Sequence, residues 1–332
     1  MARIRVFLPT YRRPGLLPRA LGSLRSQTFG DWVCEVHNDD PLDEGPRMAL
    51  ARLGDPRIVL RQHERNLGGV ETFNLVFRSC SEPFYSLLED DNWWEPDFLE
   101  SMLTVAEAHP ASTVFWANQR VWKEEPDGRF TDTGGLVQPD VGNESPRSVP
   151  WGQRAQIFGA VHSNGAMLVR SRPGEAFATP RVPFSVVEGF RERLFPYPLV
   201  FVPKPLAHFS LTLKTARSAD RGEWVMMQVM LAATYLKHAG YGKDRFASLW
   251  SEARSQRPPS TTTLLLASLI EPKCRGLRSQ ARPADWFRLA RGSLRRPAVL
   301  LRVLRAKRNH PDWWDWLDRH TAARFAEARS VA

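Results

Sequence analysis

The chain has 332 residues, of which 42% are hydrophobic, and its formal net charge is +10. This composition excludes a disordered chain, and three scattered cysteines exclude a disulfide-stapled scaffold. We find no apolar run long enough to span a bilayer and no recognisable signal peptide, so we expect a cytoplasmic protein in a reducing compartment.

Apolar residues in the first 110 positions follow two alternating patterns. Short runs rich in β-branched and aromatic residues predict strands at residues 3–9, 32–37, 57–63 and 84–88. Apolar residues at helical spacing predict helices at residues 14–27, 44–53, 68–80 and 96–109. Such alternation is typical of an α/β fold, with a mostly parallel sheet and helices on both faces.

Polar residues follow each of the four predicted strands. The clusters are Thr10–Tyr11–Arg12, Asn38–Asp39–Asp40, Glu64–Arg65–Asn66 and Glu89–Asp90–Asp91. The carboxyl ends of parallel strands meet at one edge of a sheet, so the clusters are expected to share a rim. Three consecutive carboxylates there suit a hard divalent cation, Mg²⁺ or Mn²⁺. A single acidic pair is more often a helix cap, but four clusters on one edge favour a site.

Three segments in order along the chain carry a resemblance to a known family. They read FLPTYRRPGLLPRALGSLRSQTFGDWVCEVHNDD, NLGGVETFN and SLLEDDNWWEPDFLE. Together they resemble the nucleotide-sugar-binding half of glycosyltransferase family 2, over roughly residues 3 to 110. The resemblance implies the GT-A fold and an inverting transfer of sugar from a nucleotide-diphosphate donor of the UDP, TDP or GDP type. It also implies Mn²⁺ or Mg²⁺ as cofactor.

The resemblance also implies roles for particular residues. Asp39 would read the base, Asp90 would face the ribose, and Asp91, in the DXD-type motif, would bind the metal. The other residues on the nucleotide-sugar side would be Pro9, Thr10, Tyr11, Arg12, Arg65, Asn66 and Glu89. The family often has a DDGS-like run after the second strand, whereas this chain has NDDP, with Asn38 in place of an acid.

Residues 111–215 are expected to form the acceptor half of a catalytic domain that spans residues 1–215, with the donor half at 1–110. A strand is predicted at 112–123, followed by loop-rich stretches around PDGRFTDTGG and QPDVGNESPRS. On the acceptor side the resemblance points to Trp93, His162, Ser163 and Asn164. It places the general base at Glu188, with Glu192 and Asp220 as rivals, and it suggests His208 as a metal ligand, with Lys214 as another substitute.

Residues 216–332 form a predicted helical region that holds the basic character of the chain. Residues 271–310 contain twelve basic and two acidic residues, and the rest of the chain is neutral. The segment is also amphipathic and aromatic, which suits either a helical appendage or peripheral contact with a membrane through residues 271–318, at its inner face. No nucleic-acid-binding pattern is present. The expected acceptor is a glycan, a lipid-linked sugar or a small molecule.

Two other functions fit parts of the pattern. A nucleotidyltransferase also combines a parallel sheet with carboxylate-bound Mg²⁺, but it would typically have a glycine-rich basic loop after the first strand. A non-catalytic carbohydrate-binding protein would use tryptophans for stacking on sugars, but it would not need a rim of acids.

Overall fold

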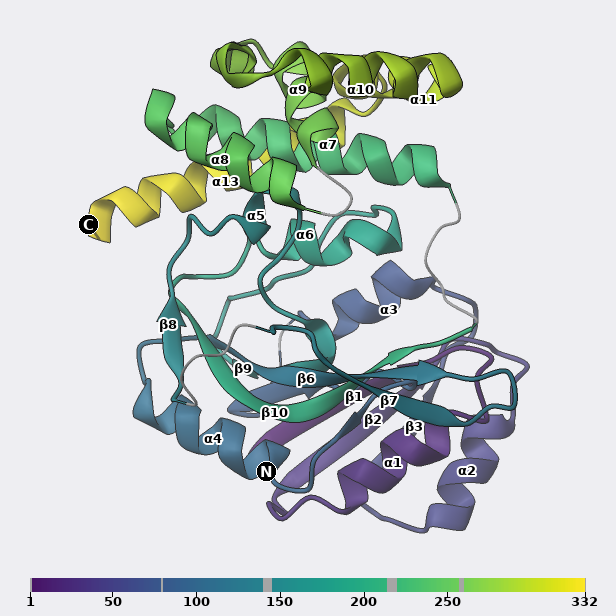
Figure 1. Cartoon of the computed structure of the whole chain (residues 1–332). Helices are drawn as coiled ribbons and strands as arrows, with labels where there is room; N and C mark the ends of the chain where they lie inside the picture. Colours follow the sequence, from purple (N-terminus) through teal and green to yellow (C-terminus); the bar gives the residue numbers. More distant parts are fainter. Residues whose placement is uncertain (1, 79, 140–144, 214–219, 257–259, 332) are drawn as a thin grey trace. The chain divides into compact units, whose positions relative to one another are not determined.

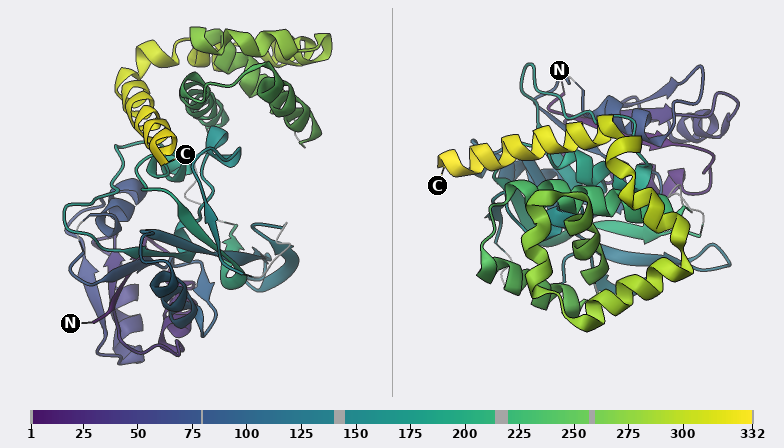
Figure 2. Two further views of the ribbon diagram at one scale, coloured as in Figure 1. Left: turned by 90° about the vertical axis from the view of Figure 1, so that its left-hand side faces the viewer. Right: turned by 90° about the horizontal axis from the view of Figure 1, so that it is seen from above.

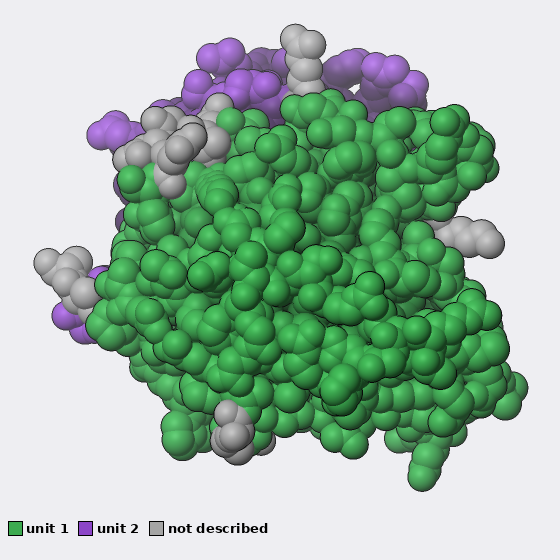
Figure 3. Space-filling view, turned by 90° about the horizontal axis from the view of Figure 1, so that it is seen from below, with its two compact units in different colours: residues 1–150, 162–181, 195–216 green, residues 151–161, 182–194, 217–332 purple. Residues whose placement is uncertain are grey.

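The computed structural model describes residues 2–78, 80–139, 145–213, 220–256 and 260–331. The chain divides into two compact units, which Figure 3 colours separately. The sheet unit comprises residues 1–150, 162–181 and 195–216. The helical unit comprises residues 151–161, 182–194 and 217–332.

Within the described residues, the sheet unit forms a ten-stranded mixed sheet with the strand order β3-β2-β1-β4-β9-β6-β10-β5, while β7 pairs with β6 and β8 with β10. The strands are β1 (Ile4–Thr10), β2 (Trp32–Asn38), β3 (Ile58–Gln62), β4 (Phe84–Leu87), β5 (Trp93–Trp94), β6 (Val114–Glu124), β7 (Phe130–Leu136), β8 (Arg147–Val149), β9 (Met167–Arg170) and β10 (Leu199–Leu211). The first four strands are parallel, as predicted. Their carboxyl ends therefore lie along one edge.

Alternation along β1 places its apolar residues on one face of the sheet. Ile4, Val6 and Leu8 are fully buried, in a core shared with α1 (Leu17–Arg25), α2 (Gly45–Leu53) and α4 (Phe98–Ala108). Helix α3 (Gly69–Val76) lies on the opposite face (Figure 1). This layering keeps the strands rigid, so the side chains that follow them are held at defined positions.

One stretch of the sheet unit that was predicted to be a loop contains a strand. The stretch PDGRFTDTGG was expected to be loop-rich, but Phe130–Leu136 form β7, which pairs antiparallel with β6. Asp127 and Gly128 make the intervening turn, and Gly128 adopts a positive φ of 80°. The prediction was wrong because turn residues dominate the segment's composition and mask its short strand. In the second expected loop, residues 140–144 lie outside the described residues.

The helical unit is built on α7 (Arg221–His238), whose middle is buried on all sides. Its other helices are α5 (Ala155–Phe158), α6 (Val187–Arg191), α8 (Lys243–Ser255), α9 (Thr261–Ile270), α10 (Pro283–Arg295), α11 (Pro297–Leu304), α12 (Ala306–Asn309) and α13 (Pro311–Val331) (Figure 2). The predicted helical character of the C-terminal region is confirmed. None of the helices described is long and apolar enough to cross a bilayer.

The segments 151–161 and 182–194 belong to the helical unit although they precede residue 216 in the sequence. The two compact units therefore interleave along the chain. The division into a catalytic domain at residues 1–215 and a helical region at residues 216–332 stays a prediction.

Candidate active site

Two adjacent carboxylates, Asp90 and Asp91, follow β4 and meet the loop that follows β1. Thr10 Oγ1 donates a hydrogen bond of 2.8 Å to Asp90 Oδ2. Arg13 Nη1 lies 2.7 Å from Asp91 Oδ2 and 3.3 Å from Asp90 Oδ1. We call Thr10, Arg13, Asp90 and Asp91 the carboxylate rim. The predicted meeting of the first and fourth clusters is thus present in the structure.

The charge of the carboxylate rim is only partly compensated. Burial, together with the neighbouring Asp91, raises the pKa of Asp90 to about 6. Burial also raises the pKa of Asp91, although Arg13 opposes the shift. Both acids are harder to ionise here than in water, so a further cation would find a favourable position beside them.

The backbone of Asp91 is anchored from two directions. Arg19 Nη2 donates to the carbonyl oxygen of Asp91 at 2.7 Å, and Ser210 Oγ donates to the same oxygen at 2.5 Å. The Arg19 guanidinium lies between the rings of Trp93 and Phe130, at 3.9 and 3.8 Å from their centroids. Burial lowers the pKa of Arg19 to about 10. Arg19 therefore couples the position of Asp91 to an aromatic cluster.

His208 belongs to that aromatic cluster. Its ring stacks on Trp93 at 4.7 Å between centroids. Nδ1 accepts a hydrogen bond from Trp122 Nε1 at 2.8 Å, and Nε2 lies 3.0 Å from Glu95 Oε1. Since indole N–H can only donate, Nδ1 carries the lone pair and Nε2 the proton. The role of His208 as a metal ligand stays a prediction, and it requires one of these bonds to break.

The rim suits a divalent cation through its donor chemistry. Mg²⁺ is commonly held by one or two carboxylates, with waters and substrate phosphates completing its coordination. Asp90 and Asp91 provide such a pair. Among the described residues there is no cluster of three or more acidic, histidine or cysteine side chains arranged for a metal. The carboxylates therefore fit a metal that a diphosphate helps to bind.

The loop after β1 is held by a second ion pair. Arg12 has a φ of 55°, a left-handed conformation that is uncommon outside glycine, and its Nε contacts Asp40 Oδ2 at 2.6 Å. Tyr11 lies beneath the Arg12 guanidinium and is 42% exposed. Arg13 and Arg19 were not predicted as site residues. The available signal was two arginines after the first strand, opposite three acids after the fourth.

Asp39 is buried where β2 ends. Its Oδ1 accepts from the backbone N–H of Leu67 at 2.7 Å and lies 3.0 Å from His63 Nδ1, and its Oδ2 accepts from Gly68 N–H at 2.9 Å. Gly68 has a φ of 85°, which a residue with a Cβ rarely adopts. Asp39 thus holds the loop before α3, on which Arg65 and Asn66 are exposed.

The remaining acid of the cluster, Glu89, lies beside the short turn at Asn164–Ala166 that precedes β9. Its Oε2 accepts a hydrogen bond from Asn92 Nδ2 at 2.6 Å. A Cβ at Gly165 would lie 2.6 Å from the same oxygen, so a larger residue there would displace the Glu89 carboxylate. Asn164 is buried next to this glycine, and buried His162 packs edge-to-face on Phe195 with 4.9 Å between centroids. Ser163, the residue between them, is half-buried.

The candidate bases belong to the helical unit, whereas the carboxylate rim belongs to the sheet unit. Glu188 lies half-buried in α6. Glu192 is fully buried and receives hydrogen bonds from Gln156 Nε2 at 2.9 Å and Val161 N–H at 3.3 Å. Asp220 caps α7 and pairs with Arg302 at 2.5 Å. Glu192 and Asp220 thus have structural partners. Lys214 lies outside the described residues.

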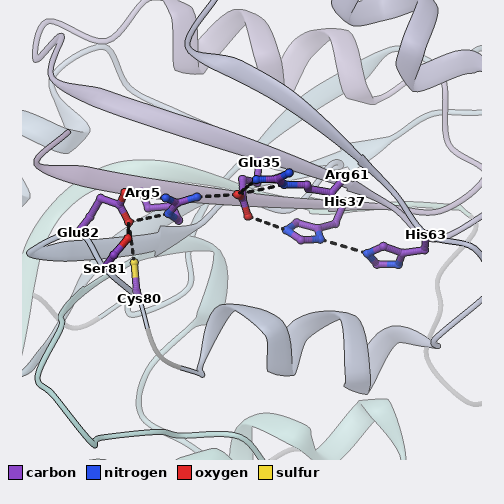
Figure 4. Close-up of polar contacts among 8 residues, drawn as sticks. All are labelled: Arg5, Glu35, His37, Arg61, His63, Cys80, Ser81 and Glu82. Atoms are coloured by element: carbon purple, nitrogen blue, oxygen red, sulfur yellow. Dashed lines mark hydrogen bonds and ion pairs between the residues drawn. The ribbon is translucent and has the colours of Figure 1, made fainter. Parts of the chain in front are cut away.

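A second group of charges lies on the face of the sheet opposite to α1, α2 and α4 (Figure 4). Arg5 binds Glu82 with two hydrogen bonds of 2.6 Å and Glu35 with a third of 2.6 Å, and Glu35 also contacts Arg61. These residues are here called the sheet-face network. The hydrogen bonds from Arg5 lower the pKa of Glu82 to about 2. From Glu35 the polar contacts continue through His37 and His63 to Asp39.

Comparisons with known proteins agree with this architecture. Residues 5–147 match the family model described as Glycosyl transferase family 2. The succinoglycan biosynthesis protein ExoW of Rhizobium meliloti is 34% identical over 103 residues, which are 30% of this chain and 32% of ExoW. The Escherichia coli protein WfgD, named as a UDP-Glc:alpha-D-GlcNAc-diphosphoundecaprenol beta-1,3-glucosyltransferase, is 24% identical over 31% of this chain and 40% of its own length. The chain therefore spans less than half of these relatives.

Solved structures share the fold. Residues 1–349 of S. aureus TarS, determined in complex with UDP, superpose with a TM-score of 0.57 at 13% identity, covering 99% of this chain and 92% of that one. The same protein in complex with UDP-GlcNAc gives a TM-score of 0.54 at 13% identity, covering 78% and 75%. The predicted fold class, a GT-A α/β fold with a helical C-terminal region, is confirmed.

Proposed function

Because the match over residues 5–147 places the chain in glycosyl transferase family 2, we propose that it transfers a sugar from a nucleotide-diphosphate donor to an acceptor hydroxyl. The observation that carries the proposal is the carboxylate rim, where buried Asp90 and half-buried Asp91 have raised pKa values. The proposed donor is of the UDP, TDP or GDP type. The proposed transfer inverts the anomeric centre and requires Mn²⁺ or Mg²⁺.

On the donor side, Asp39 accepts a hydrogen bond from the base, and Asp90 accepts one from the ribose. Uracil, thymine and guanine all present N–H donors that suit a carboxylate. Asp39 Oδ2 accepts one backbone N–H in the described residues, which supports a remaining acceptor position. The exposed Tyr11 ring offers an apolar face to the nucleotide. Pro9, Thr10, Arg12, Arg65, Asn66 and Glu89 complete the proposed donor side.

Asp91 is the proposed metal ligand, with His208 as a second ligand once it leaves Trp122 or Glu95. The metal, when bound, would balance the charge that builds up on the leaving diphosphate. Arg19 and Ser210 hold the Asp91 backbone, and so keep its carboxylate in place during the reaction. Arg13 occupies the side of Asp91 that faces Asp90 and must yield or share that position.

On the acceptor side, Glu188 removes the proton from the attacking hydroxyl, and Trp93, His162, Ser163 and Asn164 shape the pocket. A base must lie on the face opposite the leaving group, so the rim acids cannot serve. A glycan, a lipid-linked sugar or a small molecule is the proposed acceptor. WfgD is named for a lipid-linked acceptor, which supports the second of these. The proposed location is the cytoplasm.

A donor panel tests the proposal. The full chain is incubated with UDP-, TDP- and GDP-sugars and candidate acceptors, in Mn²⁺, in Mg²⁺ and in EDTA, and the released nucleotide is measured. We expect metal-dependent release with one base class, a glycosylated product by mass spectrometry and an inverted linkage by NMR. Pyrophosphate release from a nucleoside triphosphate would instead identify a nucleotidyltransferase. Glycan binding with no turnover of any donor would identify a carbohydrate-binding protein.

A further inference from the structure

Two consecutive helices of the helical unit, α10 and α11, are labelled in Figure 1. Both expose large apolar side chains. Phe287 is 69% exposed and Leu294 is 84% exposed on α10. Leu301 and Leu304 on α11 are 48% and 46% exposed. We call these four residues the apolar stripe. Single exposed apolar residues are ordinary, but a run of four over two helices indicates an interaction surface.

Helical spacing places the apolar stripe opposite the packed side of each helix. On α10 the buried residues are Asp285 and Leu289, and Phe287 and Leu294 are seven positions apart on the other side. On α11 the buried residue is Val303, and Leu301 and Leu304 lie away from it. Both helices pack against α9, so their exposed sides face away from the same neighbour.

The surroundings of the apolar stripe are cationic. Between residues 282 and 308 the sequence has nine basic residues and one acidic residue. All nine basic residues are exposed, whereas the acid, Asp285, is buried and paired with Arg254 at 2.9 Å. Within the described part of the chain, Arg291, Arg295, Arg305 and Arg308 take part in no ion pair. The surface therefore combines exposed apolar side chains with uncompensated positive charge.

We propose that the outer face of α10 and α11 docks on an anionic lipid surface, with the apolar stripe inserted among the lipids and the arginines on the headgroups. Apolar side chains flanked by Lys and Arg are the chemistry of interfacial helices. Each basic residue near an anionic bilayer adds to the attraction, which salt weakens. Docking is independent of sugar transfer and can be measured without a donor.

Other occupants match this surface less well. A second copy of the chain, paired face to face, would bring two clusters of arginine together, which is repulsive. Nucleic acid would satisfy the arginines, but Phe287 is the single ring of the apolar stripe, and Leu294, Leu301 and Leu304 offer none on which successive bases could stack. An anionic bilayer satisfies both features at once.

The test is co-sedimentation of the full chain with vesicles of phosphatidylcholine alone or of phosphatidylcholine with phosphatidylglycerol. We expect binding to the anionic vesicles only, with weaker binding as salt is raised. F287S/L294S and R291E/R295E should each weaken binding by roughly tenfold or more. Because these side chains are exposed, unchanged thermal unfolding should confirm that both variants are folded. As matched controls, L42S removes a leucine that is 87% exposed in the sheet unit, and R52E reverses an exposed charge there.

Several outcomes would overturn the proposal. One is the absence of binding to anionic vesicles, and another is binding that both double variants retain. RNA binding that R291E/R295E abolishes, in a chain that ignores vesicles, would assign the surface to nucleic acid. Concentration-dependent dimerisation that F287S/L294S abolishes, again without vesicle binding, would assign it to a second copy.

Discussion

The sheet unit contains two groups of carboxylates and arginines with opposite electrostatic outcomes. In the sheet-face network, Arg5 donates two hydrogen bonds to Glu82, and the pKa of Glu82 is lowered to about 2. In the carboxylate rim, one nitrogen of Arg13 is shared between Asp90 and Asp91, and the pKa of Asp90 rises to about 6. Both groups pair carboxylates with arginine, but the pairing geometry differs.

The difference separates structural charge from charge that is available to a ligand. A bidentate arginine satisfies both carboxylate oxygens and fixes their geometry. Two adjacent acids that share one arginine nitrogen still repel each other, so they gain from a further cation. Raised carboxylate pKa values where parallel strands end are therefore a functional signal, whereas lowered values in a network favour a structural role.

Substitutions at Glu188 and Glu192 test this distinction in the helical unit. We expect the largest of the predicted effects at Glu188. Glu188→Gln should lower turnover by about 10²–10⁴-fold with unchanged donor affinity, because it removes the proposed base. Glu192→Gln should instead lower the unfolding temperature, because Glu192 is buried and accepts hydrogen bonds from Gln156 and Val161. Steady-state kinetics and thermal unfolding measure the two effects. Normal turnover in Glu188→Gln would reassign the base.

Asp91→Asn compares the carboxylate rim directly with the sheet-face network. We expect a loss of about 10²–10³-fold in transfer, together with loss of Mn²⁺ binding by calorimetry, while the unfolding temperature stays close to wild type. The matched change in the network, Glu35→Gln, breaks the pairing with Arg5 and Arg61 and should reduce stability with Mn²⁺ affinity unchanged. Wild-type Mn²⁺ affinity in Asp91→Asn would contradict the assignment of the metal site.

The local parts of this architecture could be predicted from the sequence. Strands β1 to β4 and helices α1 to α4 follow from apolar periodicity, whereas β5 was not predicted. The meeting of Thr10 with Asp90 follows from parallel strand order. The pairing of Arg13 and Arg19 with Asp91 could not be predicted, because it depends on where long side chains point. Fully buried Glu192 was also unexpected, since charged residues are seldom buried without partners, and its partners lie far from it in sequence.

Glu82→Gln should reveal the structural role of the sheet-face network. Glu82 has a pKa of about 2 in the folded chain against an ordinary value of 4.5, so its ionised form stabilises the fold by about 3 kcal/mol above pH 4.5. This contribution is lost as the pH falls from 4.5 towards 2. Urea unfolding of the two proteins should therefore differ at neutral pH and converge in acid. An equal difference at both pH values would contradict the linkage.

Asp39→Ala should weaken binding of the free nucleotide as well as of the sugar donor. We expect about a tenfold loss, the free energy of one hydrogen bond to a charged group. Titration with UDP, TDP and GDP, followed by tryptophan fluorescence, measures it. Asp55→Ala is the control, because Asp55 also pairs locally, with Arg57 at 2.7 Å. Unchanged nucleotide affinity in Asp39→Ala would mean that Asp39 does not bind the base and only holds the loop before α3.

Arg13→Gln is the subtlest test, because it predicts a gain. Arg13 Nη1 lies 2.7 Å from Asp91 Oδ2, where an incoming cation would bind, so in the free protein the arginine competes with the metal. Removing its charge should tighten Mn²⁺ binding by a few-fold, in line with the modest strength of a single partly exposed ion pair. Calorimetry without donor isolates this effect, and Arg57→Gln, which breaks a pair with Asp55, should leave Mn²⁺ affinity unchanged. Weaker Mn²⁺ binding in Arg13→Gln would mean that the arginine holds the two carboxylates in place for the metal, and the rim would then resemble the sheet-face network more than we propose.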